Sequence, residues 1–167
     1  MHVGIALGSN IEPRLLHLHT ARRRVFELHS GSGPALCSKV YETDPVDCPE
    51  GSAPFLNAVI EIDSSLPPRE LLARLQQIEQ DMGRPRFREK NSPRTIDLDM
   101  LYYGKMAISE ENFTIPHPRL HERQFVLQPL ADLRPKMILP NVTKNIEELL
   151  ASLPNPKNLK IYSNTIY

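Results

Sequence analysis

Two aspartates, Asp97 and Asp99, lie two residues apart in the segment 93–101, which reads Pro-Arg-Thr-Ile-Asp-Leu-Asp-Met-Leu. In a strand, alternate side chains point to the same face, so both carboxylates share one face while Leu98 and Met100 point into the core. Two carboxylates this close repel each other unless a cation lies beside them, and Mg²⁺ prefers oxygen ligands completed by substrate phosphates. On spacing alone an ordinary solvated strand face is favoured by roughly two to one. The pair indicates a magnesium site only if its surroundings agree.

A basic stretch lies directly before the aspartates. Within eleven residues it sets five cations against Glu89; they are Arg84, Arg86, Arg88, Lys90 and Arg94. Phosphate transfer is catalysed mostly by positioning and by charge neutralisation with Mg²⁺ and Arg or Lys. An isolated charge run would be a solvated loop in about 70% of cases, but this one adjoins the acid pair. We therefore predict a phosphate site, and the stretch 84–94, which lies between two well-defined elements, has the character of a mobile lid over a substrate.

Several other side chains could have either a ligand-binding role or a purely structural one. His117, between two prolines, could contact phosphate or lie on a surface loop. Phe55 and Phe125 could flank a planar heterocycle or belong to the core, and Asn57 could bond a ligand or be a satisfied buried amide. Gly8-Ser9-Asn10 matches neither a P-loop nor Gly-x-Gly-x-x-Gly, which argues against a P-loop kinase and a Rossmann enzyme.

The elements that must position these residues follow from hydrophobic periodicity. Strands are predicted at 3–7, 36–43, 55–62 and 95–102, and helices at 15–28 and from Pro67-Pro68 to a cap at Gly83. The order strand, helix, strand, strand, helix, strand is typical of a ferredoxin-like βαββαβ core, an α+β fold with an antiparallel sheet and both helices on one face. Beyond it we expect a short strand near 106–108, helical pieces at 119–133 and a helix at 146–153. Residues 1–153 would form a single domain, and residues 154–167 a loosely held C-terminal tail.

Composition further narrows the class of protein and its possible partners. The chain has 167 residues, 40% of them apolar, and equal numbers of basic and acidic residues. No global field therefore attracts nucleic acid or a membrane surface. Cys37 and Cys48 indicate reduced thiols, and no apolar run reaches 18 residues, so we expect a cytoplasmic protein without nucleic-acid or membrane partners.

Several motifs together resemble the 6-hydroxymethyl-7,8-dihydropterin pyrophosphokinase family over residues 2–153. They are Ala-Leu-Gly-Ser-Asn at 6–10, Tyr-Glu-Thr at 41–43, Phe-Leu-Asn-Ala at 55–58, the segment 93–101, Pro-His at 116–117 and Arg-Gln-Phe at 123–125. The resemblance implies a transferase of tetrahydrofolate biosynthesis that moves pyrophosphate from ATP to the pterin hydroxymethyl group and releases AMP. It also implies two Mg²⁺ ions, with ATP and the pterin as substrates.

The resemblance assigns roles residue by residue. Asp97 and Asp99 would bridge the metals, and with Arg84 and Arg94 they would form the catalytic set. Pterin would lie between two aromatic rings and against polar and main-chain groups, at Thr43, Pro45, Val46, Phe55, Asn57 and Phe125. ATP-side positions would be Gln76, Glu79, Arg84, Arg94, Thr114, His117 and Arg123. The lid would run over residues 84–91. Ser92 and Asn91 depart from the family pattern, which has glycine or alanine at the first and, in some relatives, an aromatic at the second; Phe87 and Pro118 also differ.

Two rival readings remain at this point. A kinase or nucleotidyltransferase acting on another small alcohol would share the metal and arginines, but a kinase would yield ADP. A non-catalytic nucleotide- or pterin-binding module would not need both aspartates. No side chain is assigned as general base, and we expect a monomer or weak homodimer.

Overall fold

The computed structural model describes residues 1–45, 51–83, 92–154 and 159–166. Its strands are β1 (His2–Ser9), β2 (Leu36–Cys37), β3 (Val40–Thr43), β4 (Phe55–Asp63), β5 (Asp97–Tyr103), β6 (Ile108–Glu110), β7 (Phe113–Ile115) and β8 (Lys160–Ser163). Its helices are α1 (Arg14–Phe26), α2 (Pro68–Asp81), α3 (Gln124–Leu133), α4 (Ile146–Ala151) and a 3-10 turn, η1 (Leu120–Glu122).

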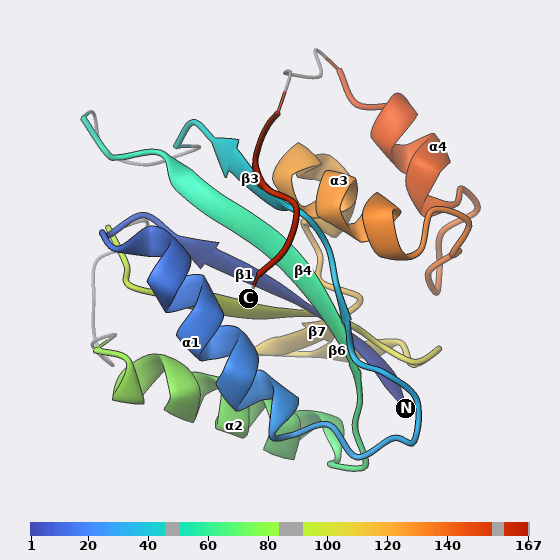
Figure 1. Ribbon diagram of the computed structural model, residues 1–167. Coiled ribbons are helices and arrows are strands. Elements are labelled where there is room, and N and C mark those ends of the chain that lie inside the picture. The colour runs from blue at the N-terminus through green and yellow to red at the C-terminus, as the bar shows by residue number, and fades with distance from the viewer. Residues whose placement is uncertain (46–50, 84–91, 155–158, 167) are drawn as a thin grey trace.

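The main sheet has the strand order β5-β1-β4-β3-β8, with β2 also paired to β4, and each of these pairings is antiparallel. Strands β6 and β7 form a separate antiparallel pair. Helices α1 and α2 cover one face of the sheet, and α3 and α4 lie on the other (Figure 1). The predicted α+β architecture with an antiparallel sheet is thus confirmed.

Strand β1 has large and small residues in alternation. Val3, Ile5 and Leu7 are buried in the core beneath α1 and α2. Gly4, Ala6 and Gly8 point to the face of α3, because successive side chains of a strand alternate between faces. A Cβ atom at Gly4 would lie 2.1 Å from the ring of Tyr102, so only glycine fits there. The small residues of β1 thus allow other groups to approach its α3 face closely.

Helix α2 follows its sequence pattern closely. Leu71, Leu75 and Ile78 recur at steps of three and four and are buried against the sheet. Pro68 begins the helix, where its missing N–H costs nothing. Gly83, with a φ of +89°, follows the end in the left-handed region that favours glycine.

A β-bulge in β5 separates the aspartates from the end of the strand. Gly4 pairs with Tyr102 but Ile5 pairs with Met100, so Leu101 is an extra residue. Leu98 and Met100 lie in the core of α1 and α2, whereas Leu101 and Tyr102 both lie in the core of α3. Asp97 and Asp99 therefore point to the α3 face.

The predicted strand 36–43 is split into β2 and β3 by Ser38. Its hydroxyl oxygen accepts the N–H of Val59 at 2.9 Å, and its own N–H donates to the Val59 carbonyl at 2.9 Å. A side-chain oxygen thus replaces a main-chain acceptor of the ladder, which a propensity pattern does not reveal.

The C-terminal segment differs from the loosely held tail expected from the sequence. Residues 160–163 add β8 to the edge of β3, and Ile166 is buried in the core with 1% exposure. The pattern of β8 was hard to recognise because three of its four residues are exposed. The described part of this segment is packed on the domain.

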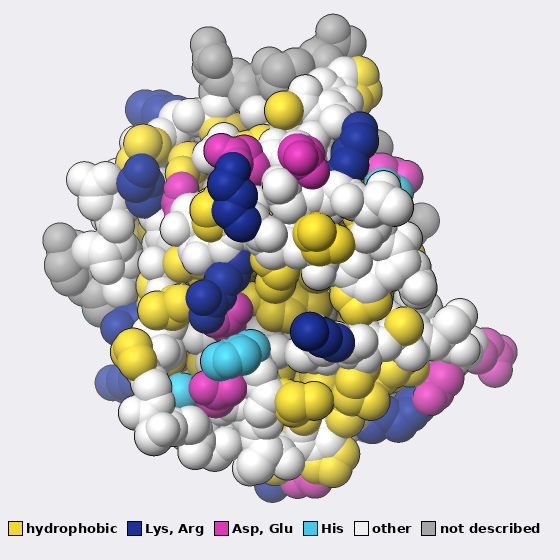
Figure 2. Space-filling view, turned by 90° about the vertical axis from the view of Figure 1, so that its right-hand side faces the viewer, with side chains coloured by type: hydrophobic (Ala, Val, Ile, Leu, Met, Phe, Trp, Pro, Cys, Tyr) yellow, Lys and Arg dark blue, Asp and Glu magenta, His cyan; other side chains and the backbone are white. Residues whose placement is uncertain are grey.

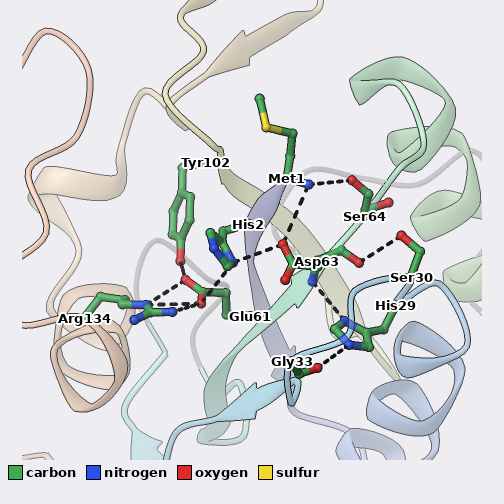
Figure 3. A network of polar contacts seen from close by, with 10 residues as sticks. All are labelled: Met1, His2, His29, Ser30, Gly33, Glu61, Asp63, Ser64, Tyr102 and Arg134. Atoms are coloured by element: carbon green, nitrogen blue, oxygen red, sulfur yellow. Dashed lines mark hydrogen bonds and ion pairs between the residues drawn. The ribbon is translucent and has the colours of Figure 1, made fainter.

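A polar network occupies the far end of the sheet from Asp97. Glu61, buried on β4, accepts bonds from Tyr102 and from Arg134, whose Nη2 lies 2.5 Å away (Figure 3). Burial opposes ionisation of Glu61, but the bonds from Arg134 and Tyr102 outweigh it and lower its pKa. His2 lies 3.1 Å from Asp63 beside them. Figure 2, which views the side where the N-terminus lies in Figure 1, shows histidine, acidic and basic side chains close together.

In the described part of the chain, no helix combines the length and apolar character needed to cross a membrane.

Candidate active site

The floor of the candidate site is Gly8, near the end of β1. It pairs with Asn57 on one side and with Asp97 on the other. A Cβ atom at Gly8 would lie 3.3 Å from Asn57 Oδ1 and 3.8 Å from the Asp97 Cβ. Glycine therefore keeps space between the amide and the carboxylate. The role of Gly8 was not predicted, although the alternation of large and small residues along β1 was a usable signal.

Two of the predicted pterin residues contact each other directly. Asn57 Nδ2 donates to Thr43 Oγ1 at 2.7 Å, and both residues are buried. The bond fixes the amide and leaves its carbonyl oxygen toward Gly8. Phe55 belongs to the same face of β4, and its ring lies near Gly8. The structure thus brings Thr43, Asn57 and Phe55 together as expected for one binding surface.

Arg94 links the ring of Phe55 to Asp97. Its Nε lies 2.9 Å from Asp97 Oδ2, and its guanidinium carbon lies 5.0 Å from the centre of the Phe55 ring. The backbone of Arg94 is held by Asn10, whose side-chain oxygen accepts the Arg94 N–H at 2.8 Å. Asn10 is a second residue whose role was not predicted, since its partner lies 84 positions away.

Arg123 forms a parallel pair with Asp99. Its Nη1 lies 3.9 Å from Asp99 Oδ2, and its guanidinium carbon lies 5.6 Å from the centre of the Phe125 ring. Burial lowers the pKa of Arg123, and the neighbouring charge of Arg119 lowers it further. Each aspartate thus has an arginine that also lies over one of the two predicted pterin rings.

His117 is held as a neutral ring beside these charges. Burial lowers its pKa to about 4, and Arg123 and Arg119 add to the shift. Its Nδ1 accepts the N–H of Arg119 at 3.2 Å, so the proton of the neutral ring is on Nε2. The N–H of His117 donates to the carbonyl of Leu101 at 2.8 Å, which ties this loop to the bulge of β5. His117 can therefore donate one hydrogen bond without carrying charge.

An open cleft of about 290 Å³ adjoins Asp99. Four predicted site residues line it together, namely Gln76, Asp99, Thr114 and His117. They come from α2, β5, β7 and the loop after β7. The cleft thus brings together residues expected on the ATP side. Arg119, which was not in the predicted set, lies close enough for its charge to lower the pKa of His117 and of Arg123.

Glu79 lies beneath the aspartates on α2. It is 8% exposed, and its Oε1 accepts the main-chain N–H of Leu98 at 2.7 Å. Leu98 stands between Asp97 and Asp99, so this carboxylate fixes the strand that carries them. A direct contact of Glu79 with ATP remains a prediction.

Three predictions concern residues that the structure does not describe. Val46, Arg84 and the lid 84–91 lie outside the described residues. Pro45 is half-buried at the end of the described segment after β3. Within the described ranges, no three His, Cys, Asp or Glu side chains form a metal-binding group.

The site has two carboxylates on one strand face, each paired with an arginine, beside a cleft. This arrangement is typical of enzymes that transfer phosphate groups. Residues 4–135 match the model of the 7,8-dihydro-6-hydroxymethylpterin-pyrophosphokinase (HPPK) family. The chain is 38% identical over 157 residues to the 2-amino-4-hydroxy-6-hydroxymethyldihydropteridine pyrophosphokinase of Haemophilus influenzae, covering 94% of this chain and 96% of that protein. It is 46% identical over 129 residues to the enzyme of the same name from Bacillus subtilis, covering 77% and 75%.

The fold is also found in solved structures. Plasmodium falciparum HPPK-DHPS with pteroate is 16% identical with a TM-score of 0.72, covering 90% of this chain and 42% of that longer one. The chain belongs to the HPPK family. Its reaction is the transfer of pyrophosphate from ATP to 6-hydroxymethyl-7,8-dihydropterin in folate biosynthesis.

Proposed function

We propose that Asp97 and Asp99 hold two Mg²⁺ ions that bind the phosphates of ATP. The observation that carries this proposal is the position of both carboxylates on the α3 face of β5, each beside an arginine. Carboxylate oxygens suit Mg²⁺, which takes its remaining ligands from water and substrate phosphates. When bound, the ions would offset the phosphate charge and lower the pKa of a coordinated hydroxyl.

The remaining side chains would position the two substrates. Phe55 and Phe125 would stack on the pterin, whose polar edge would bond Asn57 and main-chain groups near Thr43, Pro45 and Val46. On the ATP side, His117 would donate from Nε2 to a phosphate oxygen. The other ATP-side assignments are Gln76, Glu79, Arg84, Arg94, Thr114 and Arg123.

The reaction would be an in-line displacement. The pterin hydroxymethyl oxygen attacks the β-phosphorus of ATP, and AMP leaves. Arg94 and Arg84 would share the charge that develops on the phosphates. Arg94 would have to exchange its contact with Asp97 for a contact with a phosphate. This exchange would be possible because bound Mg²⁺ would neutralise the Asp97 carboxylate in place of the arginine. The general base is left without an assigned side chain.

We further assign the core to the ferredoxin-like class, with residues 1–153 as one pyrophosphokinase domain, followed by the C-terminal segment 154–167, whose strand β8 and Ile166 pack on it. The strand order β5-β1-β4-β3 and the two helices on one face support the fold assignment. We also propose a cytoplasmic monomer or weak homodimer without nucleic-acid or membrane partners, consistent with a net charge of zero.

Metal stoichiometry tests the proposal. Mn²⁺ is titrated into the protein with a non-hydrolysable ATP analogue and followed by electron paramagnetic resonance. We expect two bound ions per chain, and weaker binding in Asp97→Ala and Asp99→Ala. Full binding in both variants would show that these aspartates are not the ligands.

A further inference from the structure

Arg14, the first residue of α1, binds both strands that carry the proposed pterin residues. Its Nη1 donates to the carbonyl of Pro54 at 3.0 Å and lies 3.0 Å from Oε2 of Glu42. Glu42 directly precedes Thr43, and Pro54 directly precedes Phe55. Thr43 and Phe55 are the last partners in the pairing of β3 with β4. Arg14 therefore ties the two strands together where their pairing ends.

Arg14 is itself held in place from two sides. Its Nε donates to Oε1 of Glu12 at 2.7 Å, and its guanidinium carbon lies 5.7 Å from the centre of the Tyr162 ring. Tyr162 is the extra residue of an irregularity in the pairing of β8 with β3, since Val40 pairs with Ser163 and Tyr41 with Ile161. The C-terminal strand thus contributes a ring to this contact.

The burial of this arginine sets it apart from a solvated surface pair. Exposed ion pairs contribute little to stability, because water screens them and the side chains lose entropy. The side chain of Arg14 is 13% exposed and that of Glu42 is 24% exposed. Bonds from a charged group to shielded acceptors are stronger than neutral ones. The geometry is that of a fixed contact.

We propose that Arg14 is a positioning residue for the pterin, an inference that rests on the pterin site of the proposed function. Arg14 joins Glu42 to Pro54, and these two residues lie close to the two ends of the chain segment between β3 and β4. Without it, the terminal pair of Thr43 with Phe55 opens more readily, because strand ends with few contacts open at low cost. Thr43 also accepts the bond that orients Asn57, so the pterin surface loses its alignment. The ATP cleft, on the other side of β1, keeps its structure.

Steady-state kinetics of Arg14→Met separate this role from general damage. Methionine keeps much of the side-chain volume but makes none of the polar contacts with Glu12, Glu42 and Pro54. We expect the KM for the dihydropterin to rise about tenfold, with kcat and the KM for ATP within about twofold of wild type. Arg23→Met is the matched control, since Arg23 is an exposed arginine of the same helix, and it should change none of the three constants. An unchanged pterin KM, or equal rises for both substrates, would overturn the inference.

Two further variants complete the test. If Arg14→Met does not fold, Glu42→Gln is used instead, because it removes the charge of the partner of Arg14. A raised KM for the pterin in Glu42→Gln supports the positioning role of Arg14, whereas an unchanged KM overturns it. Phe55→Ala examines the pterin site separately. An unchanged pterin KM in Phe55→Ala contradicts the proposed site, whereas a rise in Phe55→Ala without one in Arg14→Met contradicts only the role of Arg14.

Discussion

At the scale of single residues, Asp97 and Asp99 are each paired with an arginine. Arg94 and Arg123 each neutralise one carboxylate and lie over one phenylalanine ring. The sequence predicted these residue types through the segment 93–101 and the Arg-Gln-Phe motif. It could not predict the pairing, because Arg123 reaches Asp99 only after α3 packs on the sheet.

Glu79 should stabilise β5 between the aspartates. Glu79→Ala leaves the buried N–H of Leu98 without its acceptor, which costs about 1–3 kcal/mol in the free energy of unfolding. Glu79→Gln keeps an acceptor oxygen and should recover most of that loss. Urea denaturation measures both variants.

The matched control is Gln80→Ala, at an exposed position next to Glu79 on α2. It should change the free energy of unfolding by less than about 0.5 kcal/mol. Equal losses in Glu79→Ala and Gln80→Ala would contradict the contact with Leu98.

His117 should remain neutral throughout the physiological range. Its pKa is lowered from 6.5 to about 4, so between these values the unfolded chain binds more protons than the folded one. This residue therefore favours folding above pH 6.5, and its contribution declines as the pH falls to about 4. Nuclear magnetic resonance of the metal-free protein measures the titration directly, and a pKa of 6.5 or higher would refute the environment described for this ring.

At the scale of elements, periodicity predicted most of the fold but not its irregularities. The steps of Leu71, Leu75 and Ile78 located α2, and the run from Val3 to Leu7 located β1. The gap at Ser38 depends on a side-chain oxygen that replaces a backbone acceptor of its own strand and accepts the N–H of Val59, 21 positions away. Strand β7 and its pairing with β6 were also missed, because both strands have only three residues.

The C-terminal strand gives a prediction at this scale. Ile166 is buried in the core, whereas Ile161 on β8 is 49% exposed. Ile166→Ala should cost about 2–4 kcal/mol in the free energy of unfolding, because it leaves a cavity. Ile161→Ala should cost less than about 1 kcal/mol. Urea denaturation compares the two, and equal small losses would show that the segment does not pack on the domain.

At the scale of the whole molecule, a neutral chain concentrates its charges locally. Basic and acidic residues are equal in number, yet Arg94, Arg119 and Arg123 gather around Asp97 and Asp99. Helices α1 and α2 bury the large side chains of β1, whereas Asn57, Asp97 and Asp99 lie on the other face of the sheet. There, Gly8 leaves space between Asn57 and Asp97.

Asp97 and Asp99 are proposed to serve pyrophosphate transfer to the pterin. The most direct measurement is the pterin-dependent release of AMP from ATP and Mg²⁺ by wild type and by Asp97→Ala, with ADP determined in the same chromatogram. We expect AMP without ADP from wild type, and a rate lower by at least about a hundredfold in the variant, whose fold should be intact. Pterin-dependent ADP would contradict pyrophosphate transfer, and AMP at a near wild-type rate from Asp97→Ala would contradict the role of this aspartate.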